Sequence, residues 1–152
     1  GEVFEQILSQ WLERVERAMS LPGVGWERFN LVLSAGFDLF SDYPAYVKLM
    51  RREALEGGSR LGIDLIGVVA PLFDAAVAWI DEEIRTGRFR EVDAQQVLIT
   101  AYATLLGYVS DAPFIDGLLA GDAMAPAKLA QRRIHLVDLF HRMLVPSADE
   151  VH

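Results

Sequence analysis

Cysteine is absent from the 152-residue chain, and basic residues are scarce. The lack of cysteine excludes disulfide bonds and thiolate chemistry. Lysine and arginine total 14 against 22 aspartates and glutamates, so the formal net charge is −8 at pH 7. Nucleic-acid phosphates are bound by clustered cations. The charge balance therefore argues against nucleic-acid binding by this stretch of chain.

Long apolar runs and the short motifs of common enzymes are missing too. The longest uncharged stretch, residues 94–110, contains Gln95, Gln96, Thr100 and Thr104. It is too short and too polar for a membrane span, which needs about 20 apolar residues. No glycine-rich phosphate loop, nucleophile elbow or HExxH pattern occurs in the sequence. We therefore expect no membrane segment, no catalytic residue and no cofactor.

What the chain does have is apolar content. Hydrophobic residues make up 52% of it, and the mean hydropathy is +0.22. A domain of this length buries about 70% of the surface that its unfolded form exposes. No repeat, low-complexity tract or linker divides the sequence, so we expect residues 1–152 to form a single domain. The high hydropathy indicates a second buried surface beyond the core.

Apolar residues recur at spacings of three and four along almost the whole chain, which is the period of an amphipathic α-helix. No segment shows the alternation of a strand. We therefore predict an all-α fold, a bundle of about six to seven helices. The predicted helices are residues 2–19, 26–41, 44–56, 59–86, 94–110 and 126–145.

Prolines, glycines and a serine mark the ends of the middle helices. Pro44 suits the first turn of a helix, and Gly57 or Gly58 supplies its left-handed C-terminal cap. Ser59 is the expected cap of the long helix 59–86, in which Pro71 predicts a kink or a restart.

The helix 94–110 has its own start signal. Asp93 with Gln96 three positions later resembles a capping box. The stretch "SDAPFIDGLLAGDAMAP", residues 110–126, is rich in turn residues, and we predict a connection there.

Stripes of polar residues predict which face of each helix points toward solvent. On the helix 26–41 this stripe is Glu27, Asn30, Ser34, Asp38 and Ser41. On the helix 44–56 the expected inward residues are Tyr46, Val47, Met50 and Ala54, and the outward ones are Lys48, Arg51, Arg52 and Glu53. On the last helix the stripe is Lys128, Gln131, His135, Asp138 and Arg142.

Histidines and embedded aspartates are the candidates for metal or proton chemistry. His135 and His141 lie on different sides of one helix, so they cannot share a metal ion. Asp138 and His141 have the carboxylate-x-x-His spacing of bundle metal sites, but those sites need two copies. Asp64 and Asp74 are either buried acids with a raised pKa or part of an exposed stripe at helical spacing, which we favour. We predict no metal site.

Large apolar side chains at core-facing positions allow two interpretations. They form a packed core, or they line a cavity between helices with a few polar groups, which is the usual composition of a small-molecule site. Both interiors use the same residue types, so both interpretations stay open. The candidate ligand-binding residues are Trp26, Phe29, Leu33, Phe37, Tyr46, Met50, Phe73, Tyr102 and Leu106.

The helix 94–110 is apolar around nearly its whole circumference, so it must be buried on more than one side. Small residues such as Ala101, Thr104 and Gly107 permit close approach of another helix. With the last helix it would build a two-fold, four-helix contact between two copies, and we predict a homodimer. The candidate interface residues are Leu98, Ala101, Thr104, Leu105, Tyr108, Ile134, Val137 and His141.

The order of these parts is similar to a known family. The segments "EVFEQILSQWLERV", "YPAYVKLMRREALEGG", "WIDEEIRTGRFREVDAQQVL" and "RRIHLVDLFHRML" resemble the regulatory domain of TetR/AcrR transcriptional repressors over essentially the whole chain. The passage from Gly87 to Asp93, of the form G-x-F-R-x-V-D, is the most telling.

This resemblance implies a function. In that family a small N-terminal helix-turn-helix domain reads an operator, and a larger helical domain dimerises and binds an effector that lowers operator affinity. The chain would be that larger domain, with the DNA-reading part absent from it. The expected partners are a second copy, a small lipophilic or aromatic effector and, only through the missing N-terminal domain, operator DNA. The expected location is the cytoplasm.

Two hypotheses from other classes remain. An all-helical interaction module would bind a protein partner through the helix 94–110, and it predicts exposed apolar surface with no internal cavity. A helical enzyme would act through Asp74 or through Asp138 and His141, and it predicts those residues in a cleft.

Overall fold

The computed structural model describes residues 2–20, 23–57 and 64–150. Within these ranges the chain forms seven α-helices and no strand, which confirms the all-α prediction. The helices are α1 Glu2–Ser20, α2 Trp26–Asp42, α3 Pro44–Leu55, α4 Leu65–Arg85, α5 Ala94–Ser110, α6 Ala112–Leu119 and α7 Pro126–Leu144. A 3₁₀ turn, η1, follows at Ala148–Glu150.

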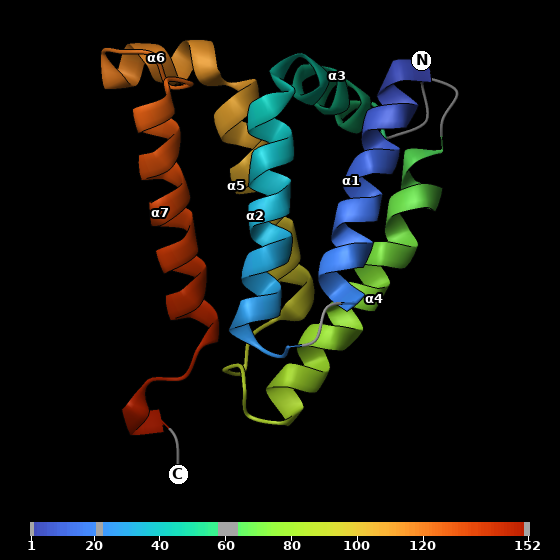
Figure 1. The fold of residues 1–152 in the computed structure, drawn as a ribbon, viewed down its shortest axis with the longest axis vertical. Helices are drawn as coiled ribbons and strands as arrows, with labels where there is room; N and C mark the ends of the chain where they lie inside the picture. Colours follow the sequence, from blue (N-terminus) through green and yellow to red (C-terminus); the bar gives the residue numbers. More distant parts are fainter. Residues whose placement is uncertain (1, 21–22, 58–63, 151–152) are drawn as a thin grey trace.

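Helix α2 occupies the centre of the bundle. It packs against α1, α3, α5 and α7, while α5 also contacts α3, α4 and α6. In Figure 1, α1 and α7 stand on either side of α2, and α3 and α6 lie across the same end of the molecule. Because α2 and α5 each touch four other helices, the interior is built mainly on these two elements.

The core consists of two groups of buried side chains. The lower core lies near the start of α2 and the end of α7, and it comprises Phe29, Leu33, Phe37, Ile80, Phe89, Ala94, Val97, Leu136, Phe140 and Leu144. The upper core lies toward α3, and it comprises Leu39, Phe40, Val47, Leu106 and Val109. Successive turns of α2 contribute to both groups, so this one helix links them.

An ion pair between the buried Glu83 and the exposed Arg88 joins the end of α4 to the loop that follows it. The carboxylate of Glu83 accepts hydrogen bonds from Arg88 Nε at 2.7 Å and from Arg88 Nη2 at 3.0 Å, and Glu83 is only 2% exposed. Gly25, just before α2, has a positive φ of 65°. A Cβ at Gly25 would lie 3.7 Å from Glu83 Oε2. The turn before α2 therefore rests directly on the end of α4.

The expected helix ends are largely confirmed. Pro44 occupies the first turn of α3, and Gly57 follows that helix with φ of 89°. The carboxylate of Asp93 accepts a hydrogen bond from the backbone N–H of Gln96 at 3.2 Å, and α5 spans 94–110 as predicted.

Replacing Asp93 with alanine is expected to lower the free energy of unfolding by about 1 kcal/mol, because an N-terminal N–H of α5 loses its acceptor. Urea unfolding followed by circular dichroism measures this. Asp93→Asn is the matched control, because the amide oxygen can still accept the bond and most of the stability should return. Equal losses in both variants would exclude capping as the reason.

Three expectations about the middle of the chain need correction or restriction. The long helix begins at Leu65, where the carboxylate of Asp64 caps it by accepting from the N–H of Gly67 at 2.9 Å. The predicted cap Ser59 lies outside the described residues. Helix α4 continues through Pro71 as a single element, so the helix does not restart there, and the kink stays a prediction.

The outer stripe of α4 is as expected, since Asp64 and Asp74 are both exposed. On α3, two neighbouring residues are the reverse of the prediction. Glu53 is 3% exposed and faces inward, whereas Ala54 is exposed. A small error in the phase of the helix explains the exchange, because adjacent residues differ by about 100° around the axis.

The stretch 110–126 contains the helix α6, which the turn-rich interpretation missed. Phe114 and Leu118 on this helix are 72% and 69% exposed. No single helix among the described residues is long and apolar enough to cross a membrane, and α5 with α6 meets that criterion only as a pair bent by 77°.

Candidate functional site

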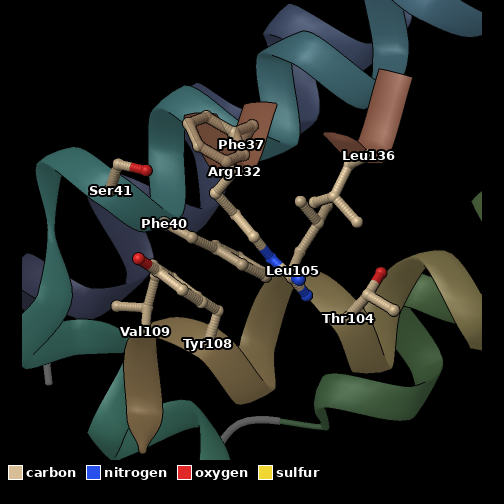
Figure 2. Close-up of a pocket in the computed structure, with 9 residues that line it drawn as sticks. All are labelled: Phe37, Phe40, Ser41, Thr104, Leu105, Tyr108, Val109, Arg132 and Leu136. Atoms are coloured by element: carbon tan, nitrogen blue, oxygen red, sulfur yellow. The ribbon is translucent and has the colours of Figure 1, made fainter. Parts of the chain in front are cut away.

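A small cavity lies where α2, α5 and α7 meet. Its volume is about 10 Å³, which is close to the space that one water molecule needs. Figure 2 shows the side chains around it. They are Phe37, Phe40 and Ser41 from α2, Thr104, Leu105, Tyr108 and Val109 from α5, and Arg132 and Leu136 from α7.

Helical spacing brings these residues to one place. On α2 the lining residues lie three and four positions apart, starting at Phe37. On α5 the same spacing relates Leu105 to Tyr108 and Val109, and on α7 Arg132 precedes Leu136 by one turn. Residues so spaced share one face of a helix. Each helix therefore turns one apolar face, with one or two polar groups, toward the cavity.

Two of the hydroxyl groups beside the cavity have partners. The Tyr108 hydroxyl donates to the carbonyl oxygen of Ala123 at 2.6 Å. The Thr104 hydroxyl contacts the carbonyl oxygens of Thr100 at 2.9 Å and Ala101 at 3.0 Å. Both hydroxyls are therefore already engaged in hydrogen bonds.

Two other polar atoms have no partner. Among the described residues, neither Ser41 Oγ nor Arg132 Nε makes a hydrogen bond, although both atoms are buried. The Arg132 guanidinium carbon lies 5.1 Å from the centre of the Tyr108 ring. Burial lowers the pKa of the Arg132 guanidinium and raises the pKa of the Tyr108 hydroxyl.

The cavity is closed in this conformation. Sites for small organic ligands usually enclose about 300–1,000 Å³, far more than the 10 Å³ between α2, α5 and α7. Of the packed and hollow interiors that the sequence left open, this conformation shows the packed one. A ligand of that size would need the helices to move apart.

The nine candidate ligand residues do not lie in one place. Phe29, Leu33 and Phe37 belong to the lower core, with Trp26 packed against it. In the upper core Leu106 is buried, and Met50 packs on its edge. Tyr46 and Phe73 are half-buried outside these two groups, and Tyr102 is 42% exposed. Phe37 is the member of the set that lines the cavity.

The candidate interface residues are also divided. Thr104, Leu105 and Tyr108 line the cavity. Leu98, Ala101 and Val137 pack against the lower core. Ile134 is 70% exposed, and His141 is exposed with its ring edge against Trp26.

A different side of α5 faces outward in the single chain. The exposed residues that follow one another along it are Gln96, Ile99, Thr100 and Ala103, and we call them the outer flank of α5. Gly107 continues this flank, and no atom lies within 4 Å of the position that its Cβ would take. The outer flank is uncharged, and its small residues are Thr100, Ala103 and Gly107.

Ser41 and Arg132 were not among the predicted site residues. Ser41 was assigned to the solvated stripe of its helix, which is wrong, because its hydroxyl oxygen is buried. The sequence does hold a signal for Arg132. It lies three residues after Leu129 and four before Leu136, which puts a cation on the apolar face of α7.

The titratable residues that drew attention in the sequence lie elsewhere. Arg142 Nε donates to Asp138 Oδ1 at 3.2 Å, while His141 packs against Trp26. Asp138 therefore has an arginine partner on its own helix. In the part of the chain that the structure describes, no three His, Asp or Glu side chains are grouped closely enough to hold a metal ion.

Comparison with models of protein families gives a match. A family model described as "Tetracyclin repressor-like, C-terminal domain" matches residues 27–140, which is well over half of the chain. The match begins in α2 and ends near the end of α7, so all three walls of the cavity lie within it. No curated protein matches the chain.

Proposed function

The chain belongs to the tetracyclin repressor-like C-terminal domain family, and on that premise we propose that it senses an effector for a TetR-like transcriptional repressor. Domains of this family are not enzymes, and they are typically the ligand-binding and dimerisation part of a regulator. The match over residues 27–140 is the observation that carries the proposal.

The proposed effector is a small lipophilic or aromatic compound that enters the interior beside α2 and α5. The site at α2, α5 and α7 supports this, because its walls are mainly aromatic and aliphatic. Since the cavity is closed, the effector must bind a conformation in which these helices lie farther apart. An effector shifts such an equilibrium only by its differential affinity for the two states. A 100-fold loss of operator affinity requires about 2.7 kcal/mol of that difference.

The proposed assembly is a homodimer through α5 and α7. The uncharged outer flank of α5 supports it, since small residues let helices approach closely across a two-fold axis. Operator DNA would be contacted only by an N-terminal helix-turn-helix domain that these 152 residues do not contain. Such a regulator would work in the cytoplasm, where its operator lies.

A thermal-shift screen with a library of apolar and aromatic compounds tests effector binding. At 100 times Kd, a ligand should add about 2.7 kcal/mol of stability, which raises the melting temperature of a domain of this size by about 5–10 °C. Thr104→Phe, which places a ring in the cavity, should abolish the shift, whereas Ala78→Phe on the outer stripe of α4 should not. A library without a single stabilising compound would argue against the proposal.

A second candidate, an all-helical interaction module, is favoured by one feature. Phe114 and Leu118 on α6 are largely exposed, which is unusual for large apolar side chains of a single chain. This candidate predicts that no small molecule stabilises the chain and that Phe114→Ser abolishes binding of a protein partner. A ligand-induced thermal shift that Phe114→Ser leaves intact would favour the effector domain.

A further inference from the structure

Arg132 places a partly buried positive charge beside the cavity, and no acid pairs with it among the described residues. Its side chain leaves α7 and runs into the space between α2 and α5, as Figure 2 shows. Its Nε is buried and makes no hydrogen bond to any described residue. The guanidinium carbon lies over the face of the Tyr108 ring, 5.1 Å from its centre.

Other arginines nearby have carboxylate partners. Arg133, the next residue on α7, pairs with Asp38 of α2. On the same helix Arg142 pairs with Asp138 at 3.1 Å. Arg142 lies at the surface of the bundle, and Arg133 is half-buried like Arg132 but is paired with an acid. Arg132 therefore lacks the kind of partner that these two arginines have.

An unpaired and partly buried cation is favoured by a nearby anion, so an anion is expected at this position. Removing a charge from water without a compensating partner carries a large desolvation penalty. The lowered pKa of the Arg132 guanidinium is a sign of that penalty. The aromatic ring of Tyr108 compensates for this penalty only in part, because cation–π contacts contribute about 0.5–2 kcal/mol.

A second buried polar atom without a partner borders the same cavity. Ser41 Oγ lines the cavity and is buried without a partner. Arginine nitrogens only donate hydrogen bonds, and a serine hydroxyl can donate one as well. A carboxylate has two oxygens and accepts at both. The remaining walls, such as Phe37, Phe40 and Leu136, suit an apolar or aromatic body.

A second copy of the chain is a poor source of this anion. Helix α5 contains no charged residue, and Asp138 is the one acid in the sequence of α7. Asp138 is already paired with Arg142. A two-fold contact through these helices would therefore bring no free carboxylate to Arg132.

We propose that the site between α2, α5 and α7 binds the carboxylate of an apolar or aromatic acid through Arg132. This inference rests on the proposed effector function and narrows it to anionic effectors. Because the cavity now has room for about one water molecule, the acid must widen the space between α2, α5 and α7 as it enters. Binding of the acid and the change in helix packing are therefore coupled.

Matched acids and alcohols test the inference on the unaltered chain. The probes are phenylacetate with phenylethanol, and octanoate with octanol, titrated by calorimetry and by thermal shift. We expect each acid to bind at least about tenfold more tightly than its alcohol, since bonds to a charged group outweigh neutral ones. Alcohols that bind as tightly as the acids would overturn the inference and leave the proposed function standing.

Variants of the two neighbouring arginines show which of them binds the carboxylate. Arg132→Gln should weaken binding of the acids by about 10- to 100-fold and leave the alcohols unchanged. Arg133→Gln, which removes an arginine paired with an acid, should leave acid binding unchanged. Circular dichroism checks that both variants fold.

The remaining outcomes also decide the matter. Acids that bind both variants equally, or a crystal grown with octanoate that shows only a water beside Arg132, would refute the inference. So would an Arg132→Gln variant that loses the dimer and keeps acid binding. If no probe binds, the carboxylate inference fails, and the library screen alone decides whether a neutral effector exists.

Discussion

Replacing Phe140 with alanine is expected to lower the free energy of unfolding by about 3–5 kcal/mol. Phe140 is fully buried in the lower core, and its ring centre lies 5.6 Å from that of Phe29. The substitution would open a cavity among side chains contributed by α2, α4, α5 and α7. For a domain of this size, that loss corresponds to a fall in melting temperature of about 6–20 °C.

Leu139→Ala is the matched control, because Leu139 precedes Phe140 on the same helix and is 39% exposed. It should cost about 1 kcal/mol or less. Urea unfolding at one fixed protein concentration measures both variants, so that dimerisation does not enter the comparison. A Phe140→Ala variant that loses no more stability than Leu139→Ala would show that α7 does not pack on the lower core.

Replacing Ala103 with glutamate is expected to convert the proposed dimer into a monomer. Ala103 lies on the outer flank of α5 and is exposed in the single chain, so the substitution should cost the fold little. In a two-fold interface each change appears twice and brings like charges together, which costs several kcal/mol. The dimer dissociation constant should rise by at least about 100-fold.

Analytical ultracentrifugation of the wild type and the variant over a range of concentrations measures this shift. Ala78→Glu on the outer stripe of α4 carries the same substitution on an exposed helix face and should leave the dimer intact. If Ala103→Glu remains a dimer, the outer flank of α5 is not the interface. A wild-type chain that is a monomer at tens of micromolar would remove the dimer proposal altogether.

The helices with clear end signals could be predicted from the sequence. Helix α5 was located at both ends because Asp93 caps it and an uncharged run ends at Ser110. Helix α6 was missed because Pro113 and Gly117 fall within only eight residues, a pattern typical of turns. In the structure Pro113 lies in the first turn, where its missing N–H costs nothing.

The site was harder to predict than the helices. Periodicity shows which face of a helix is apolar, but it does not show which helix will cover that face. Ser41 was therefore assigned to solvent, although α5 and α7 enclose it. The outward and inward sides of α5 were not separable for the same reason, because that helix is apolar all round. Whether Leu105 meets its own subunit or a second one depends on tertiary packing alone.

The position of α2 has a mechanical consequence. The helix carries cavity residues near its end, at Phe37 and Ser41, while its opposite end begins at Gly25 against the Glu83–Arg88 pair. If the proposed effector enters beside Phe37 and Ser41, we expect α2 to tilt about its Gly25 end. Helix α1, which packs along α2, would be carried with it. A small displacement of α2 near Phe37 would then produce a larger displacement of α1.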